Sequence, residues 1–379
     1  MTTHAAPDPK SFASLLRIAP VVRGCLAEPT GNEDLPHAMP LLSCHADAKG
    51  GTARTDRDEA FALDHLGPLD DLAAFRTRLA EALAARDGKP ARLTAAGLGT
   101  ITVDKPAEAG ASPMIGRVAV VTGAAGAIGY AVCLKLLENG CSVAATDLPG
   151  EKLDSFAAEL AATAPGRVIG AAMDVTDPAS VAAALSRVVE VWGGADMVVH
   201  NAGIAHVARI ADLSLEMFQK LERVNVDGTL LVLREAGDLF SRQGTGGDMV
   251  IMSTKNVPSP SAGFGAYSAT KAACHQLGRI ASLEFAAIGV RVNMVAPDAV
   301  FAEGKYKSGL WQEVGADRMK ARGLDEKGLH EYYRSRNLLK ARVTGRHVAN
   351  AVYYFVSRQS PTTGATIPVD GGLPDATPR

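Results

Sequence analysis

From Gly116 to the C-terminus, short apolar segments alternate with longer segments that carry helical periodicity. Strands connected through helices in this way run parallel, and the helices cover both faces of the sheet. This pattern predicts an α/β fold, a doubly wound parallel sheet of the Rossmann type. The expected strands are 118–122, 142–147, 168–174, 197–201, 248–253 and 290–295, and helices are expected at 128–139, 150–164 and 267–288, with two more ending near 192 and 242.

Residues 1–113 lack this alternation, and we expect them to form a small α+β extension of a main domain at 114–379. The segment 106–113 is rich in Ala, Gly and Pro, as is typical of a linker. An acidic residue, Asp70 or Asp71, is placed to cap one predicted helix of the extension. Within the extension, helices are expected at 12–26 and 69–86, a strand at 91–103, and no regular element at 28–56.

The charge distribution excludes several classes of partner. The formal net charge is −2 and no run of like charges occurs, so nucleic acid and anionic membranes are not expected partners. No apolar run approaches the ~20 residues that a membrane helix needs. The N-terminus lacks the pattern of a secretion signal, which favours a cytoplasmic protein. Free thiols and no metal site are expected, because the five cysteines form no CxxC pair.

A glycine-rich segment directly follows the first strand of the main domain and opens its first helix. Here the chain must turn tightly and let a pyrophosphate approach the backbone, whose unpaired N–H groups at the helix N-terminus attract anions. Glycine is needed because a Cβ would obstruct both the turn and the approach. The residues expected to hold the cofactor here are Gly123, Gly126, Ala127, Ile128 and Gly129.

Asp147 ends the second strand, 18 residues beyond Gly129. A carboxylate at this position can accept hydrogen bonds from the adenosine ribose hydroxyls, and it repels a 2′-phosphate. No Arg or Lys immediately follows the glycine turn or Asp147, although Lys152 is near. These features predict NAD as the cofactor in preference to NADP.

Two further strand ends carry residues that fit the same edge of the sheet. In parallel sheets, ligands bind beyond the carboxyl ends of the strands. Asp174 and Val175 lie at the end of the third strand and are expected to flank the adenine. Asn201, Ala202 and Gly203 lie at the end of the fourth strand and are expected to contact the cofactor as well.

Tyr267 and Lys271 lie four residues apart at the start of a predicted helix, on one of its faces. A tyrosine with its ordinary pKa of about 10 is a poor base at neutral pH. A neighbouring ammonium favours the phenolate, so this pair can donate and accept a proton near pH 7. Lys271 can also hold the nicotinamide ribose.

Several of these motifs together resemble the short-chain dehydrogenase/reductase family over residues 116–373. They are TGAAGAIG, HNAG, NVDG, YSATK and VDGG, in the family's order. The resemblance implies that Tyr267 is the proton donor or acceptor and that Lys271 lowers its pKa. It further implies that Asn225 supports a proton-relay water and that Pro297 borders the nicotinamide. A homo-oligomer, a tetramer or a dimer, is also implied.

The same family usually has a hydroxyl residue 13 positions before its tyrosine, which here is Thr254, with Ser253 beside it. Successive side chains of a strand point to opposite faces, so we expect only one of the two to reach the substrate. We favour Thr254, and Ser253 is the alternative. A second departure is Asp298, which stands where the family most often has glycine.

The main domain also resembles the dehydrogenase half of bifunctional rhamnulose-phosphate aldolase/short-chain dehydrogenase proteins. Residues 18–24 and 97–103 resemble fragments of a class II aldolase. Zinc-dependent aldolases of that class need clustered histidines, and the histidines of the extension show no HxH spacing. We therefore expect 1–113 to be a truncated aldolase remnant without a catalytic metal site. Its histidines are His4, His37, His45 and His65.

The segment 301–339 follows the last predicted strand, where such folds carry a substrate cover. It contains several basic and aromatic residues, which permit two interpretations. It is either a cover with cationic groups for a polar or phosphorylated substrate, or a solvated pair of helices whose aromatic rings pack on the sheet. The residues in question are Lys305, Lys307, Trp311, Tyr332, Tyr333, Arg334 and Arg336.

The combined pattern predicts an enzyme that transfers a hydride between NAD(H) and a secondary alcohol or carbonyl. The expected substrate is small, polar and hydroxylated: a polyol, sugar, sugar phosphate or hydroxyaldehyde. The alternative is a pseudo-enzyme that binds NAD as a sensor or scaffold. Two other polar residues, His200 and Cys274, are expected to be packed side chains with no chemical role.

Overall fold

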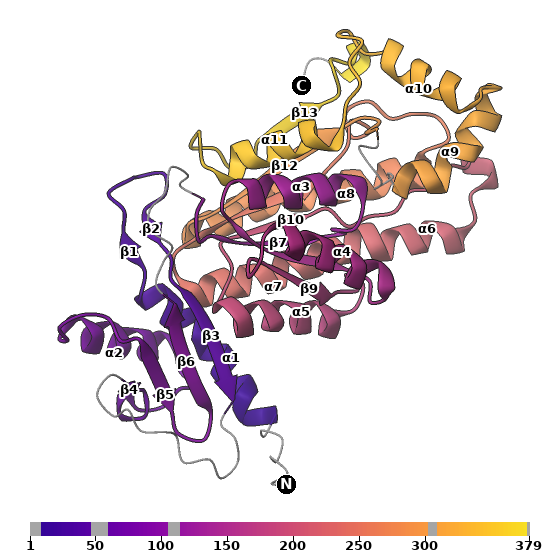
Figure 1. The fold of residues 1–379 in the computed structure, drawn as a ribbon. Helices are drawn as coiled ribbons and strands as arrows, with labels where there is room; N and C mark the ends of the chain where they lie inside the picture. Colours follow the sequence, from indigo (N-terminus) through magenta and orange to yellow (C-terminus); the bar gives the residue numbers. More distant parts are fainter. Residues whose placement is uncertain (1–8, 47–59, 105–113, 302–308, 377–379) are drawn as a thin grey trace.

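The computed structural model describes residues 9–46, 60–104, 114–301 and 309–376, except the side chains of 9, 309–314, 321 and 376. A seven-stranded sheet forms its centre (Figure 1), in the order β13-β12-β11-β10-β7-β8-β9. All neighbouring strands pair in parallel. The strands are β7 (Val118–Thr122), β8 (Ser142–Asp147), β9 (Val168–Ala172), β10 (Met197–His200), β11 (Gly247–Met252), β12 (Val290–Pro297) and β13 (Thr366–Val369).

Helices cover both faces of this sheet because neighbouring residues of each strand point in opposite directions. In β7, Val118 and Val120 belong to one hydrophobic cluster, together with α5, α7 and α8. Ala119 and Val121 belong to another, with α3, α4 and α11. The predicted doubly wound Rossmann fold is therefore confirmed. The helices are α3 (Ala127–Glu138), α4 (Glu151–Thr163), α5 (Pro178–Trp192), α7 (Gly228–Gln243), α8 (Gly265–Glu284) and α11 (Gly345–Val356).

The strand order reverses direction between β7 and β10. From β7 the chain continues to one edge of the sheet through β8 and β9, and from β10 it continues to the other edge through β11, β12 and β13. At such a switch point the loops after the two strands diverge and leave a crevice at the carboxyl edge. Before α7 the chain forms a short helix α6 (Leu215–Leu221) and a π-helical segment Glu222–Asp227. Two more helices, α9 (Gly309–Arg322) and α10 (Glu326–Ser335), lie between β12 and α11.

The N-terminal part of the chain forms a second, four-stranded sheet in the order β3-β6-β5-β4. This sheet agrees with the small α+β extension that the sequence predicted. Asp71 caps α2 by accepting from the N–H groups of Ala73 and Ala74. The division at residue 113 stays a prediction. The elements are α1 (Pro9–Cys25), β1 (Glu28–Pro29), β2 (His37–Ala38), β3 (Leu41–Ala46), β4 (Ala60–Ala62), α2 (Leu72–Ala84), β5 (Arg92–Ala95) and β6 (Gly99–Asp104).

Two expectations for this part are wrong. The segment 28–56, expected to be irregular, contains β1, β2 and β3, which are too short for a clear period-2 pattern. The single strand expected at 91–103 is a hairpin of β5 and β6. The chain reverses at Gly97, whose φ of 72° is accessible to glycine at little cost.

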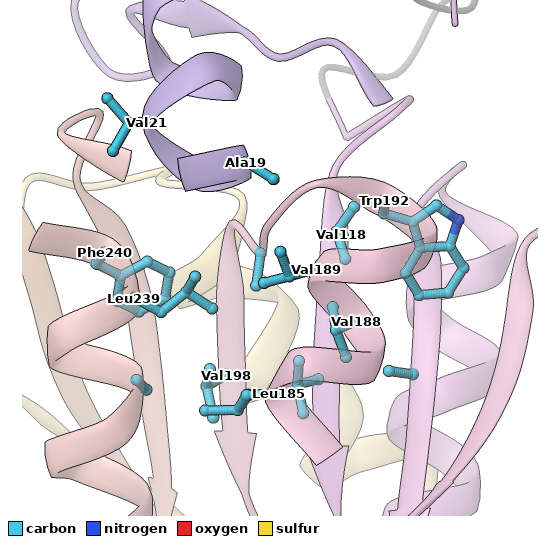
Figure 2. Packing of buried hydrophobic residues seen from close by; sticks show 14 of the residues in the cluster. Ala19, Val21, Val118, Leu185, Val188, Val189, Trp192, Val198, Leu239 and Phe240 are labelled. Atoms are coloured by element: carbon cyan, nitrogen blue, oxygen red, sulfur yellow. The ribbon is translucent and has the colours of Figure 1, made fainter. Parts of the chain in front are cut away.

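The helix α1 packs against α5 and α7 at the amino edge of the large sheet. Figure 2 shows Ala19 and Val21 of α1 beside Val189 of α5 and Phe240 of α7, all members of one hydrophobic cluster. Strand β3 also approaches α5, where Cys44 Sγ donates to the carbonyl oxygen of Val189 at 3.7 Å. The extension therefore shares a core with the main sheet and lies opposite the carboxyl edge.

Candidate active site

A cavity of about 590 Å³ opens at the carboxyl edge of the large sheet, over the switch point between β7 and β10. It brings together all the predicted site residues except Gly129 and Asn225, which lie behind its wall. The predicted residues that line it are Gly123, Gly126, Ala127, Ile128, Asp147, Asp174, Val175, Asn201, Ala202, Gly203, Thr254, Tyr267, Lys271 and Pro297.

Two glycines of the turn are packed so closely that neither position can accept a side chain. Gly123 has a φ of 62°, and a Cβ there would lie 2.9 Å from the Cα of Ala202. A Cβ on Gly129 would lie 2.4 Å from the carbonyl oxygen of Gly123. The Asn201 amide fixes the turn from the neighbouring strand by donating to that same oxygen at 2.9 Å. Ala127 and Ile128, the first two residues of α3, line the cavity, and the N-terminus of a helix is a favourable place for a diphosphate.

Asp147 is attached to this turn. Its Oδ2 accepts from the N–H of Ala125 at 3.0 Å and its Oδ1 from the N–H of Leu148 at 2.9 Å. The carboxylate lines the cavity, as does Lys152. Asp174 organises the next loop, because its Oδ1 accepts from both the N–H and the hydroxyl of Thr176.

Helix α8 begins at Gly265, so Tyr267 and Lys271 lie in its first two turns and both line the cavity. Lys271 is 5% exposed, and its Nζ donates to the carbonyl oxygen of Met252 at 2.9 Å. An ammonium has two more N–H bonds to direct into the cavity. The ring of Tyr267 packs edge-on against Phe264, with centroids 6.2 Å apart.

Asn225 is fully buried in the π-helical segment before α7. Its amide donates to Thr270 Oγ1 and to the carbonyl oxygen of Ile204, both at 3.0 Å. Its Oδ1 accepts from the N–H of Ile204 at 3.0 Å. A Cβ on Gly203 would lie 3.0 Å from Lys271 Nζ and 3.1 Å from Asn225 Oδ1. Asn225 thus fixes the loop that separates it from the lysine.

Ser253 and Thr254 both border the cavity. Strand β11 ends at Met252, so the alternation that would direct only one of the two to the substrate does not extend to them. The Ser253 hydroxyl is hydrogen-bonded to His275 Nδ1 at 2.9 Å. Thr254 Oγ1 accepts from the N–H of Asn256 at 3.3 Å. The partner of Ser253, from the next turn of α8 after Lys271, had no signal in the sequence.

Polar residues that sequence reasoning did not assign to the site also line the cavity. They include Asn256, whose buried Oδ1 has no hydrogen-bond partner in the described part of the chain and can accept from a substrate hydroxyl. Lys255 and Arg318 are cationic and nearly buried, at 7% and 6% exposed. The only signal for Lys255 and Asn256 is that they directly follow Ser253 and Thr254.

Asp298 is paired with Arg336, whose Nη2 lies 2.5 and 2.6 Å from the two carboxylate oxygens. This ion pair joins the loop after β12 to the end of α10 and gives the unusual acid a partner. Of the segment expected to cover the substrate, Tyr333 and Arg336 line the cavity. Arg334 is 44% exposed and pairs with Glu331. Neither interpretation applies to all of these residues, and a cover for the substrate stays a prediction. Lys305, Lys307 and the Trp311 side chain lie outside the described residues.

His200 and Cys274 are buried, as expected of packed side chains. The His200 ring bridges Thr122 Oγ1 and Thr229 Oγ1, each at 3.1 Å. Burial, and then the positive charge of Lys271, lowers the pKa of His200 to about 3. The imidazole is therefore neutral at pH 7 and supports the strand from which Asn201 extends.

No group of three or more His, Cys, Asp or Glu side chains that could hold a metal ion occurs among the described residues. Within the same residues, no helix has the length and apolar character to cross a membrane.

Residues 123–374 match the family model described as enoyl-(acyl carrier protein) reductase. A short-chain dehydrogenase/reductase of Armillaria gallica is 34% identical over 68% of this chain and 96% of its own length. A sorbitol dehydrogenase of Cereibacter sphaeroides is 32% identical over 52% of this chain and 74% of its own. The chain belongs to the short-chain dehydrogenase/reductase family, and it is an oxidoreductase.

Two further similarities show how much of this chain, and how much of each relative, the matched region covers. An uncharacterized oxidoreductase of Bacillus subtilis is 36% identical over 69% of this chain, and the match spans only 38% of that relative. The crystal structure of a sorbitol-6-phosphate 2-dehydrogenase from Erwinia amylovora superposes with a TM-score of 0.62 at 29% identity. It covers 67% of this chain and 98% of its own.

Proposed function

We propose that the protein transfers a hydride between NAD(H) and a secondary alcohol or carbonyl of a small hydroxylated compound, with Tyr267 as the acid–base group. The observation that carries this proposal is the shared cavity. It joins the glycine turn, Asp147, Tyr267 and Lys271 at one edge of the sheet. A cofactor site and a proton donor must share a cavity if hydride and proton are to reach one carbon–oxygen bond.

The residues present fit a dinucleotide. A Cβ on Gly123 or Gly129 would collide with neighbouring backbone, so both positions require glycine, and Gly123 and Gly126 line the cavity without side chains. The Asp147 carboxylate would accept from the adenosine ribose hydroxyls and repel a 2′-phosphate, which favours NAD over NADP. Asp174 and Val175 would flank the adenine, and Pro297 the nicotinamide. When bound, NAD would supply the hydride acceptor.

In the direction of oxidation, Tyr267 as the phenolate would accept the proton of the substrate hydroxyl. Lys271 would favour the phenolate through its positive charge, which Met252 holds in place. Thr254 would hydrogen-bond the reacting oxygen. Reduction would run the same proton transfer in reverse. Asn225 would support a relay water through the loop that it fixes.

The substrate class follows from the cavity wall and is supported by the relatives. Asn256 Oδ1 and the hydroxyls of Ser253 and Thr254 offer acceptors and donors for a hydroxylated chain. The names of the Cereibacter and Erwinia relatives indicate that they act on sorbitol and sorbitol 6-phosphate. We therefore propose a polyol, a sugar or one of its phosphates, or a hydroxyaldehyde.

The proposal is tested by titrating the protein with NADH and NADPH and following the change in nicotinamide fluorescence. NADH formation is then assayed on a panel of polyols and sugar acids. We expect NADH to bind more tightly than NADPH and at least one polyol to be oxidised. Failure to bind NADH at millimolar concentration contradicts the proposal. Binding without turnover of any panel member favours the alternative, an NAD-binding sensor or scaffold.

We further propose a cytoplasmic homo-oligomer, a tetramer or a dimer. Leu283 of α8 is 74% exposed and Leu230 of α7 is 50% exposed, so both helices present apolar surface that a second copy can cover. Light scattering of the purified protein measures the assembly directly. A monomer at micromolar concentration contradicts this part of the proposal.

Residues 1–113 are proposed to be the remnant of an aldolase without a catalytic metal site. The matched family model begins only at residue 123, so this origin rests on the two short fragments alone. Zinc at stoichiometric level in the purified protein contradicts the proposal.

A further inference from the structure

Three cationic side chains border the cavity near Tyr267: Lys255, Arg318 and Arg336, which we call the cationic cluster. They come from the loop after β11, from α9 and from the residue that follows α10. The Arg318 guanidinium lies 4.5 Å from the centroid of Phe264, whose ring also contacts Tyr267. Through Arg318 and Phe264, the cluster is therefore connected to the proposed acid–base group.

Lys255 has an N–H bond that is available to a ligand. It forms no ion pair within the described residues, although only 7% of it is exposed. Its Nζ donates to the carbonyl oxygen of Ser259 at 3.1 Å and to Ser261 Oγ at 2.8 Å. An ammonium has three N–H bonds, so one remains for a ligand. Removing a cation from water is costly unless an anion compensates for it.

Arg336 also has a hydrogen-bond donor that is available to a ligand. Its Nη2 binds both oxygens of Asp298, while its Nε is buried with no hydrogen-bond partner in the described part of the chain. Arg318 is positioned by stacking on Phe264 and Tyr333, at 4.5 and 5.1 Å from the ring centroids. Stacking of this kind orients the plane of a guanidinium.

The positive charges of the cluster act on one another. Burial lowers the pKa of Lys255 most, and Arg336 and Arg318 lower it further, against the opposing effect of Asp298 and Asp375. Of these two acids, Asp298 lines the cavity and Asp375 does not. A bound anion would offset the mutual repulsion of the positive charges and would favour the charged form of Lys255.

We propose that the cationic cluster binds the phosphate monoester of a phosphorylated polyol or sugar and holds its alcohol carbon beside Tyr267. A phosphate monoester carries a charge of about −1.5 to −2 and three strong acceptor oxygens, whereas a carboxylate carries only about −1. Lys255 and Arg336 each offer a donor to these oxygens, and the more highly charged group is attracted more strongly to the cations. This inference rests on the proposed function and specifies its substrate class.

Two readouts test the proposal. The first is calorimetric titration of the NADH-saturated protein with inorganic phosphate, because NADH keeps the probe from the glycine turn. The second compares kcat/KM for D-sorbitol, D-gluconate and D-sorbitol 6-phosphate. We expect phosphate to bind, and the phosphate ester to exceed the two other compounds in kcat/KM by at least about tenfold, the effect of one charge-assisted hydrogen bond.

Variants with opposite expected effects make the test independent of folding defects. Lys255→Met should weaken phosphate binding by about tenfold or more. Asp298→Asn removes the carboxylate that binds Arg336, so phosphate binding should become tighter. The matched control is Lys327→Met, because Lys327 is an exposed lysine of α10 that does not line the cavity. It should bind phosphate as the parent protein does.

The outcomes separate this inference from the proposed function. If unphosphorylated sorbitol is oxidised as well as its phosphate, or Lys255→Met binds phosphate unchanged, the inference is wrong while the dehydrogenase remains. If phosphate binding responds to both variants but no alcohol is oxidised, the anion site stands and the proposed function fails. Weaker binding in Asp298→Asn also contradicts the inference.

Discussion

Arg23 of α1 forms a buried ion pair with Asp196, the residue immediately before β10 at the amino edge of the large sheet. The two guanidinium Nη atoms donate to the two carboxylate oxygens at 3.1 and 2.8 Å. Arg23 is fully buried and Asp196 is 3% exposed. Asp196 Oδ2 also accepts from the N–H of Val118, the first residue of β7. The extension is thus tied by charge to the strands on either side of the switch point.

Breaking this pair should therefore destabilise the main sheet as well as the extension. Asp196→Asn would leave the guanidinium of Arg23 buried without a counter-charge, at a cost of about 3–5 kcal/mol in the free energy of unfolding. Urea denaturation measures the change. Asp238→Asn, which removes an exposed partner of Arg242, is the control and should cost at most about 1 kcal/mol. Equal costs for the two variants contradict the prediction.

Asp196 also makes the fold sensitive to strong acid. Burial alone would raise the pKa of its carboxyl, but Arg23 and Arg117 outweigh this effect and lower it. A lowered folded-state pKa stabilises the fold above the unfolded value of about 3.9, and this stabilisation is lost as the pH falls through the folded value. Stability curves below pH 4 should be less steep in Asp196→Asn than in the parent protein.

His200 should reduce stability at milder acidity. Its folded pKa of about 3 lies below the unfolded value of about 6.5, so below pH 6.5 only the unfolded chain binds the proton. The free energy of unfolding should then fall by about 1.4 kcal/mol per pH unit for this residue. Urea denaturation at pH 7 and pH 5 measures the slope. His200→Asn should show a smaller slope, and an unchanged slope would be evidence against neutral burial.

Tyr267→Phe should remove turnover while preserving the site. The ring that packs on Phe264 is kept and only the hydroxyl is lost. General acid–base catalysis contributes about 10²–10⁴-fold, so kcat should fall by at least about 100-fold with NADH affinity nearly unchanged. Steady-state kinetics and fluorescence titration give the two values. Tyr353→Phe, which alters a tyrosine of α11 outside the cavity, serves as the control. Full activity in Tyr267→Phe refutes the assigned role.

Thr254→Ala should lower kcat more than Ser253→Ala. The Ser253 hydroxyl is already bonded to His275, whereas Thr254 Oγ1 only accepts a long contact from a backbone N–H. Loss of a hydrogen bond to the reacting oxygen is expected to cost about 10²-fold or more in kcat. Thr254→Ser should retain most activity. Loss of activity in Ser253→Ala, with Thr254→Ala near the parent value, would reverse the assignment.

Asp147→Asn should shift the cofactor preference toward NADP. The amide keeps an oxygen to accept from the N–H of Ala125 but no longer repels a 2′-phosphate. We expect the ratio of kcat/KM for NADP to that for NAD to rise by about tenfold, from loss of one close like-charge repulsion. Asp154→Asn, on the exposed face of α4, is the control and should leave the ratio unchanged. An unchanged ratio in Asp147→Asn would indicate that other residues select the cofactor.

Local patterns predicted the large sheet well because its strands are buried on both faces and read as continuous apolar runs. Strands 118–122 and 142–147 were predicted with the bounds that the structure has. The hairpin of β5 and β6 was predicted as one strand, since a single glycine at position 97 carries the reversal. Short strands in 28–56 were missed, because β1 and β2 have only two residues each and show no clear period-2 pattern.

By itself, the sequence determined the Rossmann fold, the glycine turn after β7, and the pair of Tyr267 and Lys271 on one helix. These features depend on residues that are close together in the chain. The periodicity and spacing of such residues can be observed in the sequence. Only the tertiary structure decided that Lys255, Arg318 and Arg336 meet at one cavity and that Arg23 pairs with Asp196. Those contacts join residues far apart in the chain, and their charges matter only because folding removes them from water.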